Sequence, residues 1–171
     1  SIKINPKDAE AYSNLGNIYR EIGNLHEAEL NCRHAIKLKP DFTEAYNNLG
    51  IVLQDLENFQ DAKECFKKSI LLNSRFLEAR VNLGNIYIEQ KCVDKAIQQY
   101  IKTLELNPNF NLAYYSLGDA LSKIIFKKPI KNLNQFILKL LEKKIYARPK
   151  YIARSILSLL EFDPNVNKAL E

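Results

Sequence analysis

Apolar and small side chains return along this chain at a constant interval of 34 residues. The clearest column holds glycine, at Gly16, Gly50, Gly84 and Gly118. Within one repeat, two stripes with helical spacing lie on either side of a turn at Gly23. The stripes of the first repeat are Ala11, Leu15 and Tyr19, then Ala28, Cys32 and Ala35. The pattern predicts a helix, a short turn and a second helix in each repeat.

A fixed period in this range is typical of a solenoid, in which each repeat covers the apolar face of its neighbour. We therefore expect an all-α, right-handed superhelix. Glycine inside a helix costs about 0.5–1 kcal/mol relative to alanine. Its return at one position predicts that two helix backbones approach closely there, with Gly16 facing Ala28. Such a fold is a scaffold and favours binding over catalysis.

The links between repeats carry their own signals. Pro6, Pro40 and Pro108 lie on the same grid, and Ser74 fills the remaining place. Proline ends a helix because it lacks a donor and disfavours helical geometry in the residue before it. We expect Asp41 and Asn109 to cap the helix that follows each link. An aromatic column is expected to close the corners, at Phe42, Phe76 and Phe110.

These columns resemble the tetratricopeptide repeat family. The residues that match its motif in the first repeat are Tyr12, Leu15, Gly16, Tyr19, Gly23, Ala28, Ala35 and Pro40. The resemblance covers about residues 1–124 and implies a protein-binding scaffold. Arg80 departs from the aromatic column, and Glu57 and Lys91 replace the turn glycine. We expect these departures, and Ser74 at the proline position, to weaken single corners and not the fold.

The period predicts an array over 1–124 and a basic helical cap over 125–171. The array consists of a partial repeat 1–8, the repeats 9–42, 43–76 and 77–110, and a first helix at 111–124. Terminal repeats of a solenoid need such a cap for their open apolar face. Two apolar stripes predict the cap helices: Ile130, Leu133, Ile137, Leu140 and Leu141, then Ile152, Ile156, Leu159 and Leu160.

Both ends of the sequence lie inside expected helices. Residues 1–6 align with 35–40, the end of a second helix, and Asp163-Pro164 near the other end is a helix start. We therefore expect this sequence to be part of a longer protein. Ile2 and Ile4 then add apolar surface that favours self-association.

The distribution of charge predicts a domain boundary, and the cysteines indicate a cellular compartment. Residues 1–122 hold 14 Lys and Arg against 16 Asp and Glu, whereas residues 123–171 hold 11 against 4, so we place a boundary near Ile124. Three interpretations of the basic tail stay open: a solvated face, a patch for nucleic acid or an anionic membrane, and contact with a neighbouring domain. The three cysteines have no paired spacing and indicate reduced thiols in the cytoplasm.

The candidate site is the concave groove that the first helices of the repeats are expected to line. Its proposed peptide-binding residues are Asn14, Asn17, Arg20, Asn47, Asn48, Asn82, Asn85 and Tyr115. An asparagine ladder can hydrogen-bond the backbone of an extended peptide. It looks similar to the asparagine-lined groove of O-linked N-acetylglucosamine transferases. An alternative stays open, in which these asparagines only cap helices or bridge repeats.

The groove is flanked by acidic residues, which favours a neutral to basic protein or peptide partner: Glu10, Glu21, Glu44, Asp55, Glu78 and Glu89. The clamp that some relatives use for acidic chaperone tails needs inward lysine and arginine, which the matching positions lack. Those positions read Ser13, Asn17, Asn48, Glu78 and Asn82. We expect neither nucleic acid nor a membrane as the partner.

Catalytic signals are weak. His26 and His34 stand apart from other ligand-type residues, so we expect no metal and no cofactor. The prediction is a non-catalytic protein–protein interaction scaffold. An alternative is an accessory, substrate-recruiting region of a larger methyltransferase or glycosyltransferase, since residues 145–150 and the leucine-rich helix after them look similar to bacterial fusions of that kind.

Overall fold

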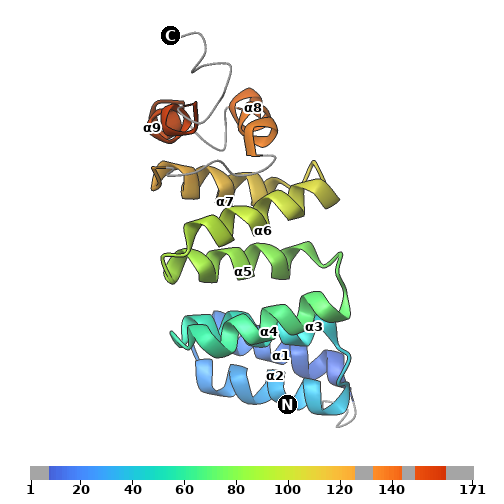
Figure 1. Cartoon of the computed structure of the whole chain (residues 1–171). Coiled ribbons are helices and arrows are strands. Elements are labelled where there is room, and N and C mark those ends of the chain that lie inside the picture. Colours follow the sequence, from blue (N-terminus) through green and yellow to red (C-terminus); the bar gives the residue numbers. More distant parts are fainter. Residues whose placement is uncertain (1–7, 126–132, 144–148, 161–171) are drawn as a thin grey trace, which may run out of the picture. The chain divides into compact units, whose positions relative to one another are not determined.

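The computed structural model describes residues 8–125, 133–143 and 149–160, and within these ranges the chain is helical and forms no strand (Figure 1). The expected all-α repeat fold is confirmed. The chain divides into two compact parts, residues 1–86 and 87–171, which are described separately below. The boundary that the sequence suggests near Ile124 is a different one and stays a prediction.

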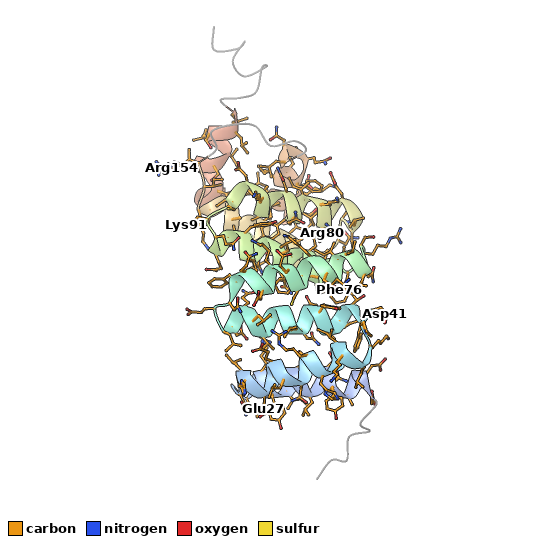
Figure 2. The ribbon with its side chains drawn as sticks, turned by 60° about the horizontal axis from the view of Figure 1, so that its bottom comes forward. Glu27, Asp41, Phe76, Arg80, Lys91 and Arg154 are labelled. Carbon is orange, nitrogen blue, oxygen red and sulfur yellow. The ribbon has the colours of Figure 1, made fainter. Side chains whose placement is uncertain are left out.

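The first part is built from helix–turn–helix repeats. Its helices are α1 (Ala9–Glu21), α2 (Leu25–Leu38), α3 (Thr43–Asp55), α4 (Phe59–Leu72) and most of α5 (Leu77–Glu89). Helix α1 packs on α2 and α3 packs on α4, while α2 and α1 each also contact α3. Figure 2 shows Asp41 and Phe76, from the links after α2 and α4, on the same side of these helices.

Glycine at two positions permits the tight helix crossings. A Cβ atom added to Gly16 would lie 2.5 Å from Sγ of Cys32 and 3.2 Å from the carbonyl oxygen of Ala28. A Cβ atom added to Gly50 would lie 2.6 Å from Cε1 of Phe66. Cys32, Ala28 and Phe66 are fully buried, so these neighbours have little room to move. The close approach expected from the glycine column is confirmed at both positions.

The substitution Gly50→Ala is expected to destabilise the fold. The added methyl group meets the buried ring of Phe66, and overpacking of this kind costs about 1–3 kcal/mol, which exceeds the helix propensity gained. Urea unfolding followed by circular dichroism measures the change in the free energy of unfolding. Lys68→Ala, at an exposed position on α4, is the control and should change it by less than about 0.5 kcal/mol. A Gly50→Ala variant as stable as the parent would contradict the close crossing.

The turns inside the repeats share one backbone conformation whatever residue occupies them. Gly23 has φ 80°, and the matching residues Glu57 and Lys91 have φ 59° and 57°. This left-handed region suits glycine, because a Cβ atom comes too close to the following carbonyl oxygen. Asn24 and Asn58 are the N-cap residues of the helices that follow two of these turns, and each side chain accepts from a first-turn amide. The repeat therefore imposes the turn even where the sequence lacks glycine.

Glu57→Gly should stabilise the protein. A non-glycine residue in the left-handed region costs about 1 kcal/mol, and glycine removes this strain. Gly23→Ala at the matching turn should destabilise it by a similar amount, although nothing lies within 4 Å of a Cβ atom there. Thermal unfolding of both variants tests the pair. Shifts of the same sign would contradict a purely conformational cause.

The expected caps at Asp41 and Asn109 are wrong. The N-cap residues of α3 and α7 (Asn111–Ser122) are Phe42 and Phe110, one position after Asp41 and Asn109, and neither helix receives a side-chain cap. The physical reason at the first corner is burial. Phe42 is 8% exposed and packs with Ala35 and Ala45. The aromatic corner predicted for Phe42 is thus confirmed and takes the place of a polar cap.

The second part contains α6 (Val93–Leu106), α7, α8 (Leu133–Lys143) and α9 (Pro149–Leu160), with α6 in contact with α7 and α8, and α7 in contact with α9. The apolar stripes predicted for the tail helices are largely buried, with Leu133, Leu140 and Ile152 fully so, whereas Leu160 is 37% exposed. Ile130 lies outside the described residues. The hydroxyl of Ser155 on α9 donates to carbonyl oxygens near the end of α7.

Candidate functional site

The predicted asparagines of the first part lie on α1, α3 and α5, the first helices of three successive repeats. In one column, Asn14 is exposed, while Asn48 and Asn82 are half-buried. In the neighbouring column, Ser13 and Asn47 are buried, with exposed fractions of 2% and 6%. The two columns therefore have different roles.

Hydrogen bonds join these columns from one repeat to the next. Nδ2 of Asn48 donates to Oγ of Ser13 over 2.9 Å, and Nδ2 of Asn82 donates to Oδ1 of Asn47 over 3.0 Å. Asn47 and Asn48, both on α3, therefore tie that helix to α5 and to α1 respectively. The sequence left open that these asparagines bridge repeats, and Asn48 and Asn82 do so.

A third contact joins α1 and α3 near their other ends. Nε of Arg20 lies 2.6 Å from Oδ2 of Asp55, and both side chains are 36% exposed. Exposed ion pairs contribute about 0.2–1 kcal/mol, so this pair adds orientation more than stability. Ser13 and Arg20 are two helical turns apart, or about 10 Å along the axis of α1. The two helices are thus joined at two separate points.

All three contacts join residues that are 35 positions apart in the sequence. The repeat length is 34, so a residue meets the position one after its own equivalent in the next repeat. One residue corresponds to about 100° around a helix, so the adjacent residues Asn47 and Asn48 can reach different neighbours of α3. Pairs of polar residues 35 positions apart in the sequence could have predicted these bonds. They could also have predicted that Asp55 pairs with Arg20.

The bridging bonds fix the orientation of two side-chain amides. An asparagine amide carries two donor hydrogens and one acceptor oxygen. Because Nδ2 of Asn48 and of Asn82 is held by the preceding helix, each Oδ1 is turned away from that partner. Among the described residues no donor is recorded for either Oδ1. The face therefore offers oriented acceptors.

The other predicted residues differ in accessibility. Asn17 and Asn85 are half-buried, and Asn47 is enclosed between helices. Tyr115 lies on α7 in the second part and is 63% exposed there. Their contribution to a common site stays a prediction.

The electrostatic balance of the face is acidic. Glu10, Glu44 and Glu78 are exposed at the same position of three repeats, and no ion pair in the described ranges involves them. Arg20 is engaged by Asp55 and does not offset them. The acidic surplus anticipated from the sequence is therefore present on α1, α3 and α5.

The surroundings of His34, Cys32 and Cys65 do not indicate a reactive site. The rings of His34 and Tyr12 are in tilted contact, with centroids 4.2 Å apart and an angle of 46° between their planes. Burial raises the pKa of the Cys32 thiol to about 12 and that of Cys65 to about 11, which keeps both thiols protonated at neutral pH. Within 8–125, 133–143 and 149–160 no group of three or more His, Cys, Asp or Glu side chains could hold a metal. Over those ranges no helix is long and apolar enough to span a membrane.

Asn82→Ala should lower the free energy of unfolding by about 1–3 kcal/mol, because it leaves the buried Oδ1 of Asn47 without a donor. Asn14→Ala is the matched control: this residue occupies the same column, is exposed and should cost less than about 0.5 kcal/mol. A double-mutant cycle with Asn47→Ala isolates the coupling. Equal costs for Asn82→Ala and Asn14→Ala would contradict a bridging role.

Comparison with known families identifies the repeats. The tetratricopeptide repeat model matches residues 9–42 and 43–76, and a further TPR repeat model matches residues 84–124. The chain belongs to the tetratricopeptide repeat family. The resemblance stated from the sequence is thereby confirmed.

Solved structures agree with this assignment. The crystal structure of MamA protein is 30% identical, with a TM-score of 0.65, over 81% of this chain and 74% of that one. An O-GlcNAc transferase from Thermobaculum terrenum is 21% identical with a TM-score of 0.67, over 79% of this chain and 26% of its own length. The first TPR of Spaghetti (RPAP3), bound to HSP90 peptide SRMEEVD, is 22% identical with a TM-score of 0.63, over 70% of this chain and 95% of that chain.

Proposed function

We propose that the chain is a non-catalytic interaction scaffold that binds an extended, neutral to basic peptide on the asparagine-bearing face of α1, α3 and α5. Repeats of this family are generally non-catalytic, and a related structure holds a peptide, which supports a protein-interaction role. The observation that carries the finer proposal is the pair of anchored amides. Asn48 and Asn82 each use Nδ2 internally and leave Oδ1 to a ligand.

The chemistry of this face suits a peptide backbone. Every residue of an extended segment except proline carries an N–H donor, so acceptors spaced along successive helices bind the main chain without selecting side chains. Anchoring the amides in advance reduces the conformational entropy lost on binding. The exposed carboxylates of Glu10, Glu44 and Glu78 add a preference for lysine or arginine in the ligand.

The same features disfavour an acidic ligand. Spaghetti binds the HSP90 peptide SRMEEVD, which carries three carboxylate side chains. In this chain the positions that a carboxylate clamp would use hold asparagine, serine and glutamate, and Arg20 is already paired with Asp55. We therefore propose a different ligand class from that of this relative.

Binding should weaken when the anchored amides are removed. Peptides selected by display from a random library are the probe, and fluorescence anisotropy measures their Kd. Asn48→Ala combined with Asn82→Ala should raise Kd about tenfold or more, since each lost hydrogen bond contributes about 0.5–1.5 kcal/mol. SRMEEVD should bind at least tenfold more weakly than the selected basic peptides, by the charge argument above.

Two controls separate loss of binding from loss of fold. Asn31→Ala removes an asparagine on α2 whose Nδ2 bonds the backbone of its own helix, and it should leave Kd unchanged. Ser13→Ala removes the partner of Asn48 while keeping the amide, so its effect on Kd should be smaller than that of Asn48→Ala. Unchanged binding in the double alanine variant, or a preference for SRMEEVD, would contradict the proposal.

The compartment stays a proposal, with the cytoplasm supported by three cysteines that lack paired spacing. The role as a recruiting region of a larger transferase also stays a prediction.

A further inference from the structure

Arg80 is the one position where the aromatic column of the first helices holds a charged side chain, and it lies in the first turn of α5. The matching residues are Tyr12, Tyr46 and Tyr114. Arg80 is 6% exposed, which makes it more buried than Tyr12 and Tyr46, both half-buried. Arginine stays charged in proteins, and a buried charge is costly unless it is paired and hydrogen-bonded.

The contacts of this guanidinium are incomplete. Nη2 donates to the carbonyl oxygen of Ser74 over 3.0 Å, and Nε is buried with no hydrogen-bond partner among the described residues. No ion pair in those ranges includes Arg80. A carbonyl oxygen is a neutral acceptor and leaves the charge uncompensated. Desolvation accordingly lowers the pKa of Arg80.

The guanidinium lies at the N-terminus of a helix. Helical side chains tilt toward the N-terminus, and Ser74, the contact of Arg80, precedes the first residue of α5 by three positions. The side chain therefore points to the end at which the first-turn amides of α5 lack intrahelical acceptors. Helices α1, α2 and α4 fill this need with a side-chain oxygen from Asp8, Asn24 and Asn58. Helices α3 and α7 receive no such bond, and among the described residues no side chain bonds the amides of Leu77, Glu78 or Ala79 either, so the buried Arg80 is what distinguishes α5.

We propose that the first turn of α5 and Arg80 together form an oxyanion site, which binds a carboxylate or phosphate group. The positive end of the helix and the orphan Nε donor both favour the same ligand chemistry. Arg75, exposed in the link before α5, adds a second positive charge nearby. Glu78 does not fill the site from within, because residues two apart in a helix face different directions.

This site is distinct from the asparagine face. Asn82, the ladder residue of α5, is two positions from Arg80 and bonds to α3, whereas Arg80 bonds to the link before α5. The inference therefore does not depend on the proposed peptide ligand. Binding at either site can fail while the other is present.

Amide NMR chemical shifts of the full chain test the proposal, with sodium phosphate and sodium acetate titrated at constant ionic strength against sodium chloride. The amide signals of Leu77, Glu78 and Ala79 and the Nε–H signal of Arg80 should shift in a saturable way. A stronger effect of acetate indicates that a partner's carboxylate is the ligand, and a stronger effect of phosphate indicates a free or protein-bound phosphate.

Arg80→Tyr is the matched variant, because tyrosine occupies this column in the other repeats. It should keep the remaining amide spectrum, raise the melting temperature in the absence of anion, and lose the saturable shifts. Arg33→Leu, which removes an exposed arginine of α2, should leave the shifts unchanged. The proposal is overturned if the shifts do not saturate, or if Arg80→Tyr shows the same shifts as the parent.

Discussion

Close approach of two helix backbones is the constraint on which the rest of this structure depends. Gly16 and Gly50 leave no room for a Cβ atom against Cys32 and Phe66, so the paired helices touch where a larger residue would separate them. Tight pairs hold the first helices of successive repeats at a spacing where short polar side chains can reach across. The hydrogen bonds of the asparagine columns presuppose that spacing.

The polar contacts between the first helices of successive repeats join residues 35 positions apart, one more than the repeat length of 34 residues. Equivalent residues, 34 positions apart, make none of these three contacts. The residue one position later points back toward its neighbour, which is why Asn48 reaches Ser13 and Asn82 reaches Asn47. One column of each helix is thus spent on holding the array together. Asn48 and Asn82 take part in these bonds through Nδ2, which leaves Oδ1 of each for the proposed ligand and links the assembly of the scaffold to its proposed use.

Departures from the repeat motif had different physical outcomes. Glu57 and Lys91 adopt the left-handed turn of Gly23, because the helices on either side dictate the turn and its strain is small compared with their packing. Arg80 takes the buried place of an aromatic residue but brings a charge that its carbonyl contact does not neutralise. The strain of a left-handed turn residue is offset by the packing of the two adjacent helices. A buried charge without an ion pair is instead stabilised by binding an oppositely charged group.

The helices, their pairing and the small-residue crossings were readable from the sequence, because a 34-residue period repeats each local choice several times and the copies support one another. The sequence also indicated which helices carry the asparagines. Only the tertiary structure decided that Asn47 is enclosed while Asn14 is exposed, and that Phe42 in place of Asp41 is the N-cap residue of α3. These outcomes depend on which flank of a helix faces its neighbour and on competition between burial and capping. A one-dimensional pattern records the kind of residue at each position, and the packing of helices determines which of its atoms remain accessible.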